Sequence, residues 1–155
     1  MLKVAKFGGS SVAGAEQFRK VKSIVEADPD RQIIVVSAAG KRNKEDHKIT
    51  DLLYLCNAHR TYGVSCEEIL SQIEARFAGI RNELGLSFDV EAAFAALRQK
   101  LDRGMSVDEL VSRGEFFTAQ LMAEYLCAAA CQLSRSRYKH IQLRRQLILN
   151  QVCSW

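Results

Sequence analysis

The first 38 residues alternate between apolar runs and one amphipathic segment. Residues 2–7 and 31–38 are mostly apolar, and the β-branched run in the second is typical of a strand that is buried on both faces. Between them, residues 15–28 carry apolar side chains at helical spacing and end close to Pro29. These side chains are Phe18, Val21, Ile24 and Val25. A strand, a helix and a strand in this order form a βαβ unit, so we expect a mainly parallel sheet with a right-handed crossover.

Helical periodicity dominates the chain from there to residue 126. We expect four helices, over about residues 50–62, 65–84, 89–103 and 106–126. Two of them open on a Ser-x-x-Glu capping pattern, at Ser65 and Ser106. The charged segment "AGKRNKEDHKI" (39–49) precedes the first helix, and we expect a long, mobile loop of functional importance there. The chain is therefore predicted to have an α/β fold.

The composition is that of one globular domain. The 155 residues are 48% hydrophobic and 26% charged, and no apolar run of about 18 residues occurs. The N-terminus lacks the charged and then apolar segments of a signal peptide. We therefore expect a cytoplasmic protein that has no membrane partner.

The net charge of +4 comes from the end of the chain. Residues 1–125 carry 17 basic and 18 acidic residues, whereas residues 126–155 carry five basic residues and no acidic one. We therefore divide the chain into a body, residues 1–126, and an atypical basic tail, residues 127–155. The tail is either an appendage that binds RNA or an acidic partner, or a sequence not native to this fold, such as a shifted reading frame or an artificial end. We favour the second interpretation, and the body has no charge pattern of a nucleic-acid-binding protein.

Five cysteines occur without any CxxC pair, and we expect free thiols in a cytoplasmic protein. They are Cys56, Cys66, Cys127, Cys131 and Cys153. Cys127 and Cys131 lie four residues apart and could share a helix face as metal ligands with His140. We regard buried or incidental thiols as the better interpretation, so no metal ligands are assigned.

The first strand ends in the sequence "KFGGSS", which begins at Lys6. In open parallel sheets, ligands bind beyond the carboxyl ends of the strands, where this lysine lies. Gly8 and Gly9 would let backbone N–H groups approach an anion, while Ser10 and Ser11 could cap the next helix and offer hydroxyl groups. These features predict a phosphate-binding turn. Because no GxxxxGK[ST] or GxGxxG pattern follows the strand, a purely structural turn explains the glycines equally well.

Two later segments are candidates for the same site. The second strand ends on small residues, from Ser37 to Gly40, which would let a ligand lie against the backbone. An ordinary turn explains these residues equally well. Thr50 lies where a helix N-cap belongs, and capping alone also explains it.

The segment "VSRGEFFTAQLMAEYL" (111–126) places a glycine inside a strong helix. Gly114 shares a face with apolar residues such as Val111 and Leu121, where glycine costs about 1 kcal/mol relative to alanine. We expect a close neighbour to require it. Glu115 could direct its carboxylate at the ammonium group of a ligand, although a solvated helix glutamate is the more common case.

Taken together, "KFGGSS", "VVSAAGKR", "TDLL" and "SRGEFFTAQLMAEYL" resemble the motifs of the aspartokinases, which belong to the amino-acid kinase superfamily. The resemblance covers residues 1 to about 126 and implies part of a three-layer αβα fold. It also implies ATP-dependent phosphorylation of the side-chain carboxylate of L-aspartate to 4-phospho-L-aspartate, for lysine, threonine and methionine synthesis. Mg²⁺ would accompany the ATP.

The resemblance implies roles for individual residues. Lys6 would stabilise the transferring phosphoryl group, and Thr50 and Glu115 would hold L-aspartate, Glu115 through the ammonium group. Positioning and charge neutralisation of this kind suit phosphoryl transfer, which needs no protein nucleophile. The residues implied in phosphate or ATP binding are Lys6, Gly8, Gly9, Ser10, Ser37 and Gly40.

The chain also departs from the aspartokinase pattern. Such an enzyme would continue into another strand, a glycine-rich segment with an active-site arginine and aspartate, an adenine-binding part and regulatory ACT domains, and none of these is recognisable after Leu126. We therefore expect a fragment that lacks kinase activity on its own. Exposed strand edges and apolar faces would favour self-association. Two alternatives stay open: a non-enzymatic module whose basic tail contacts nucleic acid or an acidic partner, and a kinase for another small carboxylate.

Overall fold

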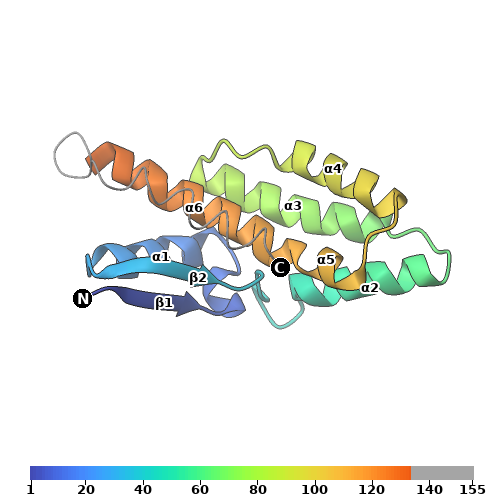
Figure 1. The fold of residues 1–155 in the computed structure, drawn as a ribbon, viewed down its shortest axis with the longest axis horizontal. Coiled ribbons are helices and arrows are strands. Elements are labelled where there is room, and N and C mark those ends of the chain that lie inside the picture. Colours follow the sequence, from blue (N-terminus) through green and yellow to red (C-terminus); the bar gives the residue numbers. More distant parts are fainter. Residues whose placement is uncertain (134–155) are drawn as a thin grey trace.

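The computed structural model describes residues 1–133, with side chains as far as Cys127, as an α/β fold (Figure 1). The elements are β1 (Lys3–Phe7), the 3-10 helix η1 (Gly9–Val12), α1 (Ala15–Glu26), β2 (Arg31–Val36), α2 (Ile49–Thr61), α3 (Glu67–Leu84), α4 (Val90–Asp102), α5 (Val107–Val111) and α6 (Arg113–Leu133). Residues 134–155, which carry the charge of the predicted basic tail, lie outside the described residues. The α/β prediction is confirmed.

The two strands, with α1 beside them, lie at one end of the molecule, and α2, α3 and α4 lie toward the other end (Figure 1). The long helix α6 contacts β2 at the first end and α2 and α3 at the second. None of the helices in the described part of the chain combines the length and apolar composition that a membrane span requires. The strands and the helices thus meet along α6.

The sheet consists of β1 and β2, which pair in parallel as predicted. In their register, Lys6 is opposite Val35 and Phe7 is opposite Val36. Both strands therefore end at the same edge of the sheet, and the turns that follow them lie next to each other.

Only one face of this sheet is covered by described residues. Phe7 is buried and Ile34 packs partly against the core, whereas Val4, Ile33 and Val35 on the other face are 62%, 41% and 43% exposed. The prediction that residues 31–38 are buried on both faces is therefore wrong for the described part of the chain. A β-branched run indicates a strand, but whether both of its faces are buried depends on elements that pack over it.

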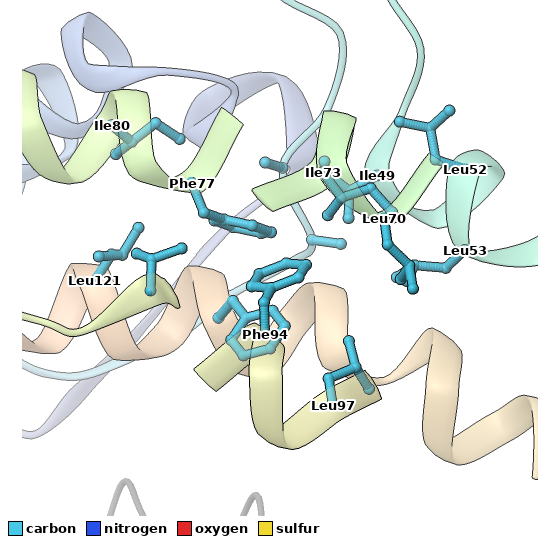
Figure 2. Packing of buried hydrophobic residues seen from close by; sticks show 14 of the residues in the cluster. Ile49, Leu52, Leu53, Leu70, Ile73, Phe77, Ile80, Phe94, Leu97 and Leu121 are labelled. Carbon is cyan, nitrogen blue, oxygen red and sulfur yellow. The ribbon is translucent and has the colours of Figure 1, made fainter. Parts of the chain in front are cut away.

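The buried apolar residues of the described part of the chain form one cluster, and its aromatic group lies among the helices. Phe77 of α3, Phe94 of α4 and Phe117 of α6 form an aromatic group, with ring centroids 4.7 Å apart for Phe94 and Phe117 and 5.5 Å apart for Phe77 and Phe117. Figure 2 shows Phe77 and Phe94 pointing toward each other, with Ile49 and Leu53 of α2 nearby. Burial of each such ring stabilises the fold by about 1.5–3 kcal/mol. This cluster holds the helical end of the molecule together.

Some predicted helix ends are correct and others are not. Ser106 caps α5, because its Oγ accepts a hydrogen bond from the N–H of Glu109 at 3.2 Å. The predicted cap at Ser65 is displaced by one residue, since Cys66 occupies the N-cap position of α3 and makes no side-chain cap. The Ser65 Oγ nevertheless accepts a hydrogen bond from the N–H of Glu67, the first residue of α3, at 3.3 Å. The predicted single helix 106–126 is divided at Ser112 into α5 and α6.

Candidate functional site

The turns after β1 and β2 are in direct backbone contact. The N–H of Gly40 donates to the carbonyl oxygen of Gly9 at 2.8 Å. A Cβ atom at Gly9 would lie 2.8 Å from the carbonyl oxygen of Ala38, and one at Gly40 would lie 2.6 Å from the carbonyl carbon of Gly9. Both positions therefore require glycine for packing. Gly8 is different, since a Cβ atom there would have no neighbour within 4 Å.

Lys6 is exposed at the end of β1, beside this pair of turns. It forms no salt bridge with any described residue, whereas Lys3 in the same strand lies 2.8 Å from a carboxylate oxygen of Asp28. An unpaired ammonium group next to exposed backbone is a suitable partner for an anion.

The serines after the glycines are arranged differently from the prediction. Ser10 lies within η1, and α1 begins only at Ala15 with Gly14 before it. Neither η1 nor α1 has a side-chain cap, so the predicted capping by Ser10 and Ser11 is wrong. Both serines are exposed, and their hydroxyls have no hydrogen-bond partner among the described residues. They remain available to a ligand.

A buried arginine that the sequence analysis missed holds the segment after β2. Arg76 of α3 donates from Nη2 to the carbonyl oxygen of Gly40 at 2.6 Å and from Nη1 to that of His47 at 2.6 Å. Its Nη2 also lies 3.4 Å from the carbonyl oxygen of Ala13, and its Nε is buried with no partner in the described part of the chain. Arg76 thus connects the turns after both strands with the loop that leads to α2.

The signal for Arg76 was present in the sequence. It lies at helical spacing with Ile73, Phe77 and Ile80, which are all buried. A charged residue on an apolar stripe calls for buried partners. Burial lowers the pKa of the Arg76 guanidinium, and the nearby carboxylate of Asp46 acts in the opposite direction.

Asp46 gives the charged loop a defined structure. It accepts hydrogen bonds from Nε and Nη2 of Arg42 at 2.8 Å and 3.1 Å, and it lies 3.5 Å from Nη2 of Arg76. The Arg42 guanidinium holds the pKa of Asp46 well below its ordinary value, and the charge of Arg76 acts in the same direction. The segment has no helix or strand, as predicted, but the expectation of a mobile loop does not fit these contacts.

The start of α2 lies against the same segment. The N–H of Ile49 donates to the carbonyl oxygen of Ala39 at 3.1 Å. Thr50 is half-buried inside the first turn of α2, whose N-cap position is Lys48, so the predicted capping role of Thr50 is wrong. Its hydroxyl has no partner among the described residues and stays available for another role.

Gly114 brings α6 to this place. A Cβ atom at Gly114 would lie 2.9 Å from the Cβ of Ala38 and 3.2 Å from Cγ2 of Ile49. The predicted close neighbour is therefore present. Glu115 follows in the first turn of α6, half-buried and without an ion pair in the described part of the chain.

A continuous series of contacts thus joins the turn after β1, the turn after β2, the start of α2 and the start of α6. Ser37 N–H donates to the Phe7 carbonyl at 3.1 Å, the two glycine turns touch, and α2 and α6 both contact residues 38–39. A cation and bare backbone lie at the strand ends, and a carboxylate lies at the start of α6. This arrangement suits a small ligand with an anionic group and an ammonium group. In the described part of the chain, no three His, Cys, Asp or Glu side chains are grouped as metal ligands would be.

Comparison with known proteins identifies the family of the chain. The model of the amino acid kinase family matches residues 1–151. Aspartokinase 3 of Bacillus subtilis (strain 168) is 38% identical over 130 residues, which are 80% of this chain and 29% of that protein. The chain therefore spans about 29% of the length of this relative.

Two solved structures are similar in fold. The crystal structure of Clostridium acetobutylicum aspartate kinase has a TM-score of 0.76 and 42% sequence identity, covering 79% of this chain and 28% of that one. The structure of E. coli aspartokinase III in complex with aspartate and ADP has a TM-score of 0.62 and 26% identity, covering 81% of this chain and 29% of that one. By its fold, its motifs and these relatives, the chain belongs to the amino acid kinase family, and within it the chain is similar to the aspartokinases.

Proposed function

We propose that the chain carries part of an aspartate kinase site. The reaction is ATP-dependent phosphorylation of the side-chain carboxylate of L-aspartate to 4-phospho-L-aspartate, in amino-acid biosynthesis in the cytoplasm. The observation that carries the proposal is the backbone contact between Gly9 and Gly40 beside the unpaired Lys6. Two glycine turns and a lysine at the ends of parallel strands can bind a phosphate group through N–H groups and a full positive charge.

In this proposal Lys6 neutralises the negative charge that grows during phosphoryl transfer. Gly8, Gly9 and Ser10 line one side of the phosphate site, and Ser37 and Gly40 line the other. Charge neutralisation by a fixed cation is among the largest contributions to such reactions. The exposure of Lys6 and its lack of an ion pair within the described residues support this role.

Thr50 and Glu115 hold L-aspartate at the other side of the site. The Glu115 carboxylate would accept hydrogen bonds from the ammonium group, and the Thr50 hydroxyl would contact a carboxylate. The packing of Gly114 on Ala38 and Ile49 supports this assignment, because it brings the start of α6 to the start of α2. The similar E. coli aspartokinase III structure contains aspartate and ADP, which supports aspartate as the ligand class of this site.

ATP supplies the phosphoryl group when it is bound. The bare backbone of Gly8 leaves open space for a phosphate, and the hydroxyls of Ser10 and Ser11 have no partner among the described residues. These features fit a phosphate chain. We propose that Mg²⁺ is held chiefly by the phosphate oxygens and water, as is usual for Mg²⁺ with nucleotides.

We further propose that the 155-residue chain does not turn over on its own. An arginine and an aspartate that the aspartokinase resemblance implies for the active site are not recognisable in this chain. The proposed site is therefore tested by ligand binding to this chain, and turnover is measured separately.

NMR titration of the isotope-labelled chain tests the proposal. Mg-ATP should shift the amide signals of Gly8, Gly9 and Gly40, and L-aspartate should shift those of Thr50 and Glu115, while D-aspartate and L-glutamate should have weaker effects. Absence of shifts at these amides in a folded chain would refute the site. In an ADP-release assay, aspartate-dependent turnover that Lys6→Ala abolishes would refute the proposed inactivity.

We also infer that the chain associates with a second copy through its sheet. Val4, Ile33 and Val35 form an exposed apolar face, and the outer edges of β1 and β2 are unpaired in the described part of the chain. An open strand edge offers a row of N–H and C=O groups that the same edge of another copy can satisfy. Packing of this apolar face against the same face of the second copy would bury its side chains.

A further inference from the structure

Cys56 and Cys66 lie close together where α2 leads into α3. Cys56 is fully buried on the core face of α2, and Cys66 is the partly exposed residue that precedes α3. The Sγ of Cys56 lies 4.0 Å from the carbonyl oxygen of Cys66. Both residues are free thiols.

Two hydrogen bonds fix the connection between them. The N–H of Val64 donates to the carbonyl oxygen of His59 at 2.8 Å, and Nδ1 of His59 donates to the carbonyl oxygen of Ser65 at 2.9 Å. His59 lies three residues after Cys56, so both side chains are on one side of α2. His59 contacts the carbonyl oxygen of Ser65, and Cys56 contacts that of Cys66. These two contacts hold the backbone of residues 65–66 against α2.

The two thiols differ in reactivity. Burial raises the pKa of the Cys56 thiol to about 12, and the neighbouring Cys66 acts in the same direction. Cys56 is therefore protonated at neutral pH and is not the first sulfur to react, because the thiolate is the nucleophile. Because Cys66 is the more exposed of the two residues, we expect a dissolved reagent to react there first.

We propose that Cys56 and Cys66 form a reversible disulfide by exchange with a small-molecule disulfide such as glutathione disulfide. The Cys66 thiolate attacks one sulfur of glutathione disulfide, forms a mixed disulfide and releases one glutathione thiolate. Cys56 then gives its proton to solvent and attacks the Cys66 sulfur, which releases the second glutathione. Two protein thiols are oxidised, and one glutathione disulfide is reduced to two glutathione molecules.

The disulfide would join α2 to the start of α3 across a short connection. Because α2 begins at Ile49, beside the loop that Asp46 and Arg76 hold, oxidation would fix the helix that ends this loop. Cross-linking also restricts the unfolded chain. The oxidised form should therefore unfold at a higher urea concentration than the reduced form. This inference does not depend on the kinase proposal.

The test uses the full chain with Cys127, Cys131 and Cys153 replaced by serine, so that only the pair remains. Its circular dichroism should match that of the unsubstituted chain. After incubation with glutathione disulfide and alkylation of the remaining thiols, trypsin cuts after Lys48, Arg60 and Arg76. The expected product of digestion is peptide 49–60 linked to peptide 61–76. The mass of the intact chain should fall by two hydrogen atoms on oxidation and return to its original value with dithiothreitol.

Single variants in the same background separate the two steps. Cys56→Ser should stop at a stable glutathione adduct on Cys66. Cys66→Ser should react more slowly, on the order of tenfold, because the remaining thiol is buried and protonated. Since Cys66 is partly exposed, this variant keeps the test valid if Cys56→Ser fails to fold. Glutathione adducts without linked peptides, or linkage only in urea-unfolded chain, would overturn the proposal.

Discussion

Gly9 and Gly40 touch backbone to backbone, and neither position has room for a Cβ atom. A methyl group at Gly40 would lie 2.6 Å from the carbonyl carbon of Gly9 and 2.8 Å from the nitrogen of Ser10. The contact fixes the turn after β1 against the turn after β2 without any side chain. The relative position of the two strand ends thus depends on these two glycines.

Gly40→Ala should lower the free energy of unfolding by about 1–3 kcal/mol, because the backbone on both sides must move to admit the methyl group. Urea unfolding followed by circular dichroism measures this change. Gly8→Ala is the matched control, since Gly8 has open space and an ordinary φ of −73°. Equal stability of the two variants would contradict the importance of the contact.

Arg76→Met should lower the free energy of unfolding by about 2–5 kcal/mol, because buried carbonyl groups lose their donors. The groups affected include the carbonyls of Gly40 and His47. Arg98→Met is the control, as Arg98 forms partly exposed ion pairs with Glu67 and Glu74 and contacts no buried carbonyl group in the described part of the chain. Exposed ion pairs contribute about 1 kcal/mol or less each. If both variants lose the same stability, Arg76 is no more important than a surface arginine.

The stability contributed by Asp46 should depend on pH. Its pKa is held below the ordinary value in the folded chain, so the unfolded chain binds more protons as the pH approaches about 4. The stabilisation by the Asp46 carboxylate is therefore complete above the pKa that Asp46 has in the unfolded chain. It is lost as the pH falls toward the lower pKa that Asp46 has in the folded chain. The stability difference between the wild type and Asp46→Asn should be largest near neutral pH and shrink in acid.

Urea unfolding at several pH values measures this difference. Glu45→Gln is the control, because Glu45 is exposed and makes no ion pair within the described residues. A difference between wild type and Asp46→Asn that stays constant down to the acid range would contradict the role of the carboxylate charge.

Lys6→Met and Glu115→Gln should affect different ligands. Lys6→Met should weaken Mg-ATP binding and Glu115→Gln should weaken L-aspartate binding, each by about 10–100-fold, as expected for loss of one charged hydrogen-bonding group. NMR titration gives both affinities. Lys20→Met, on the exposed side of α1, is the charge-matched control. Equal weakening of both ligands by either variant would indicate a general change of structure instead.

Val4→Thr together with Val35→Thr should shift the chain toward the monomer. Threonine keeps the β-branched shape that suits a strand while reducing the apolar area. Sedimentation velocity at several concentrations measures the association. Ile24→Thr is the control, because Ile24 is 47% exposed on α1. An equal effect of the control would show that association does not require the sheet face.

The parts of the fold that follow local patterns could be predicted from the sequence. The parallel pair of strands, the cap at Ser106 and the close neighbour of Gly114 each depend on short segments or on one helical face. The contact between the segments of the candidate site follows from the same patterns, because their residues lie at strand ends and helix starts. The resemblance to family motifs also implies that these segments share one site.

The parts that depend on distant partners could not be predicted. Arg76 lies on an apolar stripe, but its partners at Ala13, Gly40 and His47 are far away in the sequence. The exposure of Val35 depends on which elements cover the sheet, and no local pattern carries that information. The division of the last helix at Ser112 likewise interrupts an apolar pattern that continues on both sides.

The aromatic cluster of Phe77, Phe94 and Phe117 lies among α3, α4 and α6, away from the glycine turns. More of the largest fully buried side chains lie in α2 to α6 than in residues 1–40, where Val12, Phe18 and Val21 are buried and the two turns are held by backbone contacts and Arg76. Local opening needs less free energy where fewer apolar contacts must be broken. We therefore expect the glycine turns to open at a lower free energy than the helical core, so that a variant can lose binding at the proposed site while its helices stay folded.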